Sequence, residues 1–270
     1  MTSYAVAFLV FNTVLVMLLP RRWAALPLLI GAFYMTLGEV LLIGPFHFTI
    51  IRLIFAVGII RVFMRGEWVA TELNMLDKTM MVWALWLLIS SFFHNNPSDK
   101  LIFNLGFVYN TCCAYFLFRV FTRSKEDVIA IYCMIAFLLV PVAITMCIEA
   151  ITQQNLFSIF GGVPELSTIR EGKIRAQGPF AHAILAGTVG AANIPIMAGL
   201  WQHNRIMAIL GITACISMVI ACSSTGPVIS SIVAVLSLGM WFYRKNMRIL
   251  RWVAVIGYIM LDIVMKVPAY

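Results

Sequence analysis

The 270-residue sequence contains few charged residues. Asp, Glu, Lys and Arg together make up 11 % of it, less than half of the roughly 25 % found in typical soluble domains. Hydrophobic residues make up 62 %, and the mean hydropathy is +0.97. A water-soluble fold of this size cannot cover so much apolar surface with polar side chains. The composition excludes a soluble globular domain and predicts an all-α, polytopic membrane helix bundle.

The sequence also lacks the patterns of several enzyme classes. It has no HExxH, no Asp-x-Asp pair and no GxxxxGK[ST] pattern, so neither a metal site nor ATP is predicted. No other cofactor is indicated. The cysteines show no CxxC spacing and no histidine partner, which favours packing roles over disulfides or metal ligands. They stand at positions 112, 113, 133, 147, 215 and 222.

Long apolar runs dominate the chain, and no soluble domain or repeat separates them. A helix needs about 20 apolar residues to cross the hydrocarbon core of a bilayer. Residues 1–3 carry no basic segment, which predicts a retained first span rather than a cleaved signal peptide. We therefore expect one integral-membrane domain over residues 1–270, with about ten spans. The runs are 4–19, 24–42, 48–63, 79–93, 101–117, 128–150, 180–201, 206–221, 228–242 and 249–265.

The excess of basic over acidic residues, +8 in net charge, is explained by topology rather than by nucleic acid. Lys and Arg collect in the cytoplasmic loops of membrane proteins. The gaps after alternate spans, starting with the first, hold Arg21, Arg22, Arg61, Arg65, Lys78, Arg119, Arg123, Lys125, Arg205, Arg244, Lys245, Arg248 and Arg251. The opposite side holds only Lys100, Arg170, Lys173, Arg175 and Lys266. This asymmetry predicts that both termini are external.

The longest gap, residues 151–179, is predicted to be external, although it holds Arg170, Lys173 and Arg175. It leads into Gly178-Pro179-Phe180-Ala181-His182. Glycine at an N-cap with proline at the first helical position is typical of a helix start. The N–H groups of residues 180–182 and the helix dipole would then form an anion site. Arginine adds a planar fork suited to phosphate. The alternative is a solvated loop.

Four other ionisable residues lie near the predicted external ends of spans. His182 would sit in a first helical turn, where a neutral imidazole can accept a proton; the alternative is an interfacial histidine bonded to a loop carbonyl. Arg52 lies about one turn inside the third span, and Glu39 and Glu149 end the second and sixth. Ionisable groups at membrane depth are costly and face the bundle interior. For Arg52 a structural and a functional role are equally open, whereas the glutamates favour helix packing.

Residues 169–188, IREGKIRAQGPFAHAILAGT, resemble the RAxGxFxHP-type signature of the O-antigen ligase and O-antigen polymerase superfamily, in particular its exopolysaccharide polymerase-like branch. The likeness is detailed over residues 149–226 and includes the Ser-Ser-Thr-Gly-Pro turn at 223–227. Two features depart from the family. Ala183 stands where members usually have proline. Members are also longer, with a second large external loop that would begin after residue 270, so the chain resembles the first part of such a protein.

The resemblance implies a membrane glycosyltransferase of surface polysaccharide assembly in the bacterial inner membrane. Such enzymes transfer or polymerise glycan on the periplasmic side, from a polyprenyl-diphosphate-linked donor to a glycan or lipid-linked acceptor, without a metal. On this hypothesis Arg175 and His182 are catalytic, and the substrate-binding residues are Arg170, Lys173, Gly178 and Arg52. The alternatives are a polysaccharide or lipid transporter or flippase, and a non-catalytic truncated remnant.

Overall fold

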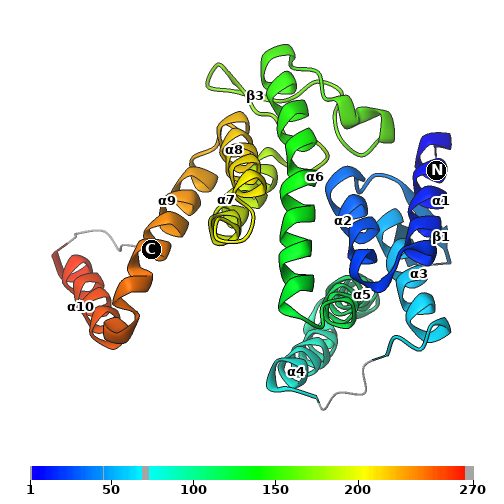
Figure 1. The fold of residues 1–270 in the computed structure, drawn as a ribbon, viewed down its shortest axis with the longest axis horizontal. Coiled ribbons are helices and arrows are strands. Elements are labelled where there is room, and N and C mark those ends of the chain that lie inside the picture. The colour runs from blue at the N-terminus through cyan, green and yellow to red at the C-terminus, as the bar shows by residue number, and fades with distance from the viewer. Residues whose placement is uncertain (1, 45, 69–72, 265–270) are drawn as a thin grey trace.

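The computed structural model describes residues 2–44, 46–68 and 73–264, most of them helical (Figure 1). The α-helices are α1 (Ser3–Leu18), α2 (Ala25–Tyr34), α3 (Ile50–Met64), α4 (Met75–Ser90), α5 (Pro97–Phe121), α6 (Lys125–Thr152), α7 (Ala183–Leu200), α8 (Arg205–Ala221), α9 (Thr225–Met240) and α10 (Met247–Val264). Two antiparallel hairpins accompany them, β1 (Val40–Ile43) with β2 (Phe46–Thr49) and β3 (Ile169–Arg170) with β4 (Lys173–Ile174). Each predicted apolar run overlaps one of these helices.

Among the described residues, four helices are long and apolar enough to cross a membrane. They are Met75–Phe93, Pro97–Phe121, Lys125–Thr152 and Ala183–Leu200. A fifth span is possible if α9 and the helix after it, which meet at a bend of 98°, count as one. The structure therefore confirms that the chain is a helical membrane protein, as the predicted all-α class requires.

The second apolar run, 24–42, does not form the single helix predicted for it. The helix ends at Tyr34, Met35 adopts an extended conformation, and the chain enters the β1–β2 hairpin at Val40. The run is apolar throughout, but hydropathy alone does not separate a buried helix from a strand. The hairpin leads directly into α3.

Two hydrophobic clusters share α6, which runs through the middle of the view in Figure 1. The first joins α1, α2, α3 and α5 to the N-terminal half of α6; the second joins α7 and α8 to its C-terminal half. Small residues let α7 approach α8 closely: a Cβ on Gly190 would lie 2.8 Å from the carbonyl oxygen of Cys215. Such small-residue contacts are typical of helices packed in lipid.

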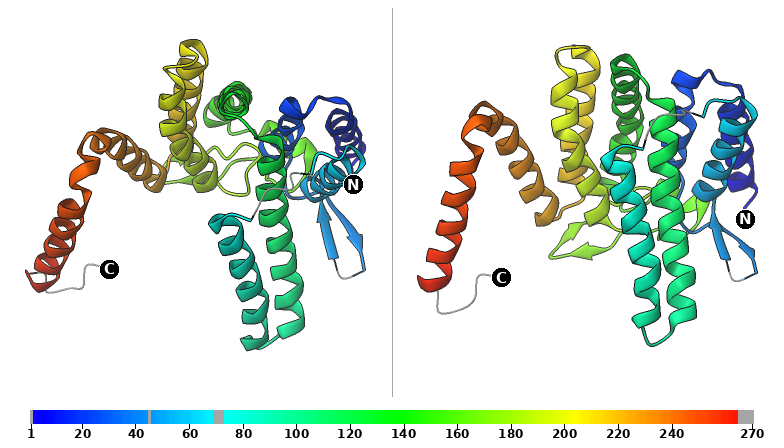
Figure 2. Two further views of the ribbon diagram at one scale, coloured as in Figure 1. Left: turned by 60° about the horizontal axis from the view of Figure 1, so that its bottom comes forward. Right: turned by 90° about the horizontal axis from the view of Figure 1, so that it is seen from below.

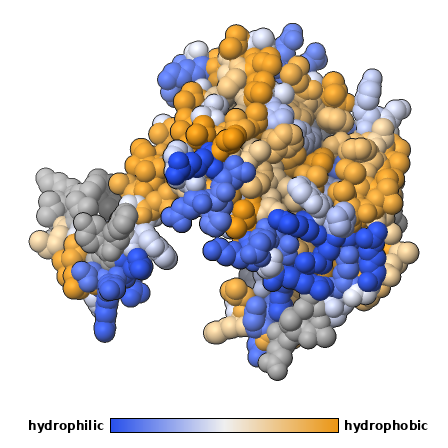
Figure 3. Space-filling model, viewed as in Figure 1, coloured by the Kyte–Doolittle hydropathy of each residue, from blue (hydrophilic) through white to orange (hydrophobic). Residues whose placement is uncertain are grey.

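Large apolar side chains are exposed over much of the surface, as the orange areas of Figure 3 show. They are prominent on α4 and α5, which are held together by Asn104. Its Nδ2 donates to the carbonyl oxygen of Leu87 at 3.0 Å and to the Oγ of Ser91 at 2.8 Å. In the right-hand view of Figure 2, this helix pair extends beyond its neighbours. Its outer face therefore suits contact with lipid.

Arginines at the ends of several helices are paired with carboxylates and carbonyls. Arg61 is fully buried, donates to both carboxylate oxygens of Glu67 at 2.9 and 3.0 Å, and also reaches the carbonyl oxygen of Leu19 at 2.8 Å. Two more ion pairs at these helix ends join Arg21 with Asp127, at 3.2 Å, and Arg119 with the buried Asp77. They join the ends of α1, α3, α4, α5 and α6 that sequence reasoning assigns to the cytoplasm. Because each charge has a partner, its burial is tolerated.

We expect Arg61→Ala to lower the free energy of unfolding by about 3–5 kcal/mol, because it leaves the carboxylate of Glu67 and the carbonyl oxygen of Val16 without this donor. Arg205→Ala, which removes an exposed arginine from the start of α8, should change it by less than about 0.5 kcal/mol. Thermal unfolding in a neutral detergent measures both. Equal stability of the two variants would contradict the assigned role of Arg61.

Candidate functional site

The loop between α6 and α7, residues 153–182, is called the cap loop below. Its second half is bound by a buried carboxylate. Glu149, near the end of α6, is 1 % exposed. It accepts hydrogen bonds from the Oγ of Ser167 at 2.5 Å, the N–H of Gln177 at 3.0 Å and the N–H of Gly178 at 2.8 Å. Three donors on one carboxylate offset the cost of burying its charge. These three hydrogen bonds hold the second half of the cap loop against the C-terminal end of α6.

Further contacts fix the cap loop to other elements. The side chain of Asn155 donates to the carbonyl oxygen of Gly178 at 2.9 Å, and the N–H of Ala176 donates to that of Ala221, the last residue of α8, at 3.1 Å. Gly162 packs directly against Gly38, between α2 and β1, where any Cβ would overlap the opposite backbone. The cap loop is therefore a folded element anchored to α2, α6 and α8.

The predicted helix start at Gly178 is wrong. Gly178 has a φ of +56° and its N–H is bonded to Glu149, so it stands in a left-handed turn. The N–H of Phe180 closes this turn onto the carbonyl oxygen of Gln177 at 3.1 Å. The helix α7 begins only at Ala183, with His182 in extended conformation as its N-cap. The N–H of Phe180 is used within this turn, and residues 180–182 precede the helix, so they do not form its first turn as expected.

The basic residues of the cap loop are distributed over two places. Arg170 and Lys173 face each other across the β3–β4 hairpin and are exposed, and the Nε of Arg170 lies 3.6 Å from an oxygen of Glu171. His182 is also exposed. These side chains are open to a ligand from the aqueous side, but their own geometry defines no pocket.

Arg175 differs from its neighbours because it is partly buried. Its N–H donates to the carbonyl oxygen of Thr168 at 3.0 Å. Its Nε is buried and has no hydrogen-bond partner within the described part of the chain. Burial raises the pKa of the Cys222 thiol, and the positive charge of Arg175 opposes that rise. The next residue, Ala176, bonds to the carbonyl oxygen of Ala221, so Arg175 stands near the turn between α8 and α9.

Arg52, on the first turn of α3, lies at a separate pocket. Its Nε donates to the Oδ1 of Asn110 at 3.0 Å and its Nη1 donates to the carbonyl oxygen of His47. The hydroxyl of Tyr109 donates to the carbonyl oxygen of Arg52 itself at 3.0 Å. The pocket has a volume of about 890 Å³. Its lining comes from β2, α3 and α5: His47, Phe48, Arg52, Asp99, Ile102, Phe103, Leu105, Gly106, Val108 and Tyr109.

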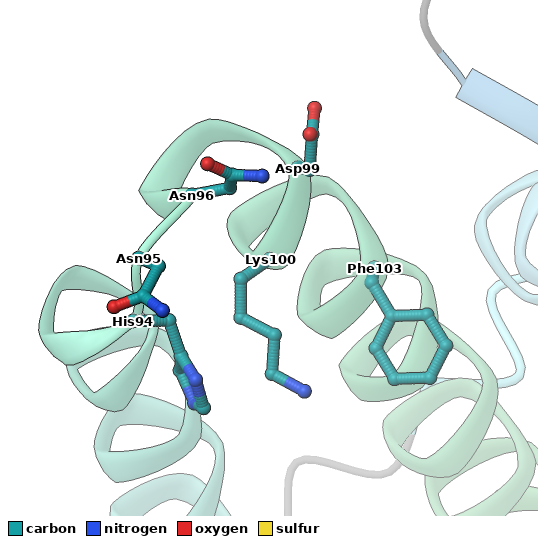
Figure 4. Close-up of a pocket in the computed structure, with 6 residues that line it drawn as sticks. All are labelled: His94, Asn95, Asn96, Asp99, Lys100 and Phe103. Atoms are coloured by element: carbon teal, nitrogen blue, oxygen red, sulfur yellow. The ribbon is translucent and has the colours of Figure 1, made fainter.

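A smaller pocket of about 370 Å³ lies at the turn between α4 and α5 (Figure 4). The Nζ of Lys100 lies 5.0 Å from the ring centroid of Phe103, whereas the carboxylate of Asp99 points away from Lys100. The other lining residues are His94, Asn95 and Asn96. The two pockets share Asp99 and Phe103, so this turn borders the Arg52 pocket.

The structure does not bring the predicted site residues together into one site. The described hydrogen bonds of the Arg52 side chain go to β2 and α5, and none reaches the cap loop. In Figure 1, β1 lies to the right of α6 and β3 to its upper left. Sequence reasoning missed Gly106, Tyr109 and Asn110. Gly106 and Asn110 are four residues apart and share one face of a helix, but this spacing does not show that the face meets Arg52.

The chain matches no protein-family model, no curated protein and no solved structure. In the described residues, no group of three or more His, Cys, Asp and Glu side chains is placed to hold a metal ion.

Glu149→Gln should release the cap loop, because an amide replaces one acceptor oxygen with a donor that faces other donors. We expect a loss of about 3 kcal/mol in local stability, seen as faster amide hydrogen exchange over the cap loop and faster tryptic cleavage at Arg170 and Lys173. The matched control is Glu165→Gln, whose exposed side chain lies in the same loop. Unchanged exchange in the Glu149 variant would refute the anchoring role.

Proposed function

We propose that the chain is the membrane part of a glycosyltransferase of surface polysaccharide assembly in the bacterial inner membrane. It transfers or polymerises glycan from a polyprenyl-diphosphate-linked donor to a glycan or lipid-linked acceptor on the external side. The proposal includes ten spans with both termini outside. In the right-hand view of Figure 2, the β1–β2 hairpin, the β3–β4 hairpin and the α4–α5 turn lie toward the same side of the molecule. This arrangement supports the alternation of spans.

The observation that carries the proposal is a contrast between two groups of arginines. At the proposed cytoplasmic ends, Arg21, Arg61 and Arg119 are each paired with a carboxylate. Arg52 and Arg175, near the loop-bearing side, are partly buried and form no ion pair with any carboxylate of the described residues. Guanidinium groups withdrawn from water without a counter-charge favour binding of an anion. A diphosphate provides the charge that they lack.

The chemistry follows from the needs of the reaction. The acceptor hydroxyl oxygen attacks the anomeric carbon, the bond from that carbon to the diphosphate oxygen breaks, and the hydroxyl proton passes to a base. Arg175, with Arg170 and Lys173 at the hairpin, stabilises the charge that develops on the leaving diphosphate. His182, exposed at the start of α7, is the candidate base. No step requires the N–H of Gly178, which is occupied by Glu149.

Arg175→Ala should reduce glycan transfer by about 100-fold or more, because it removes a cation from the leaving group in the transition state. Arg205→Ala, which removes an exposed arginine on the opposite side, should leave the rate unchanged. The measurement uses protein in liposomes with lipid-linked donor and acceptor and no ion gradient. Transfer without a gradient separates a transferase from a transporter, since transport alone forms no glycosidic bond. Wild-type transfer rates in the Arg175 variant would refute the proposed role.

A further inference from the structure

The guanidinium of Arg52 is held by neutral groups at two of its three nitrogens. Its Nε and Nη1 donate to the side-chain oxygen of Asn110 and to the carbonyl oxygen of His47. Neither acceptor carries a charge, so these bonds orient the group but leave its positive charge uncompensated. The guanidinium has five N–H donors, and Nη2 has no hydrogen bond to a described residue. The donors of Nη2 are therefore left for a ligand.

Gly106 leaves the space in which this guanidinium lies. A Cβ on Gly106 would stand 2.9 Å from the Cζ of Arg52 and 3.1 Å from its Nη1, and closer still to Nη2. The planar group thus lies against the backbone of α5, and any side chain at position 106 would displace it. Glycine in a helix interior costs stability relative to alanine. At position 106 this cost has a specific reason, because the glycine leaves room for the guanidinium of Arg52.

The surroundings of Arg52 indicate the chemical class of the ligand. Asp99 also lines the pocket, but it is exposed and forms no ion pair with Arg52 among the described residues. Most other lining side chains are apolar, and two of them, Phe103 and Leu105, are also exposed on the outer surface of α5. One fixed cation in an apolar pocket that continues onto such a surface complements a molecule with an anionic head and an apolar tail.

We propose that Gly106 and Asn110 are positioning residues that hold Arg52 to bind the phosphate head of an amphiphile in this pocket. Asn110 fixes the guanidinium through Nε, and Gly106 provides the flat surface on which it rests. The phosphate is bound by the Nη2 donors of the guanidinium, and the tail lies along the apolar lining of the pocket. This deepens the proposed function, on which it rests and in which a phosphate-bearing lipid is a substrate.

Asn110→Asp separates a positioning role from a merely structural one. The carboxylate keeps the hydrogen bond to Nε and adds a counter-charge, so thermal stability should be equal or higher while the affinity for phosphate falls at least about tenfold. The probe is dodecyl phosphate, titrated calorimetrically into the full chain in a neutral detergent. Asn95→Asp adds the same charge at the exposed α4–α5 turn and is the matched control, with affinity within about twofold of wild type.

Gly106→Ala provides the second test. The methyl group pushes the flexible Arg52 side chain away without touching the core, so stability is retained and dodecyl phosphate affinity falls at least about tenfold. Gly199→Ala is the control, because a Cβ at Gly199 meets nothing within 4 Å. It should bind as wild type does.

Two further probes identify the source of the phosphate. Inorganic pyrophosphate and dodecyl glucoside, which lack the tail and the charge respectively, should each bind at least about tenfold more weakly than dodecyl phosphate. The proposal is overturned if the wild-type chain does not bind dodecyl phosphate, if pyrophosphate binds as well, or if the Asn110→Asp and Gly106→Ala variants both bind as wild type does. A different result separates the two proposals. If the variants lose binding but the wild-type protein shows no glycan transfer, the phosphate site is supported and the proposed function is refuted.

Discussion

The buried carboxylate of Glu149 is the contact on which the arrangement of the cap loop depends. Its partners, Ser167, Gln177 and Gly178, all come from the second half of the loop, so one side chain sets where the chain enters α7. This contact also decides which donors remain for a ligand. By accepting from the N–H groups of residues 177 and 178, it removes both from the donors open to a ligand, and α7 begins only at Ala183.

Much of the helical architecture was predictable because apolar runs in a membrane protein leave the backbone few choices. Each predicted run overlaps one helix, and the starts of α4 and α6 follow from polar caps. At each start the N-cap side chain and the aspartate three residues later bond to one another's backbone N–H, as Asn74 does with Asp77 and Ser124 with Asp127. The prediction of one helix over residues 24–42 was wrong because the apolar side chains there suit a strand as well as a helix.

The sequence was enough to single out candidate residues of the site, but not to show which of them lie together. Charge asymmetry singled out Arg175, and depth in the membrane singled out Arg52. Both lack a carboxylate partner among the described residues, which is consistent with the expectation of an anion. No local pattern reveals that Arg52 rests on Gly106 and Asn110, because that contact joins two helices distant from each other in the sequence. The helix start predicted at Gly178-Pro179 was wrong for a related reason. The N–H of Gly178 bonds to a residue of α6 that is distant in the sequence.

The exposed apolar side chains beside the Arg52 pocket have a consequence for how a ligand arrives. Phe103 is 65 % exposed and Leu105 37 % exposed, so the mouth of the pocket continues into a surface suited to acyl or prenyl chains. Under the proposed role, an amphiphile that enters there approaches sideways, by diffusion within one leaflet. Occupancy then follows the mole fraction of that molecule among its neighbouring lipids, and dilution of the surrounding water does not change it.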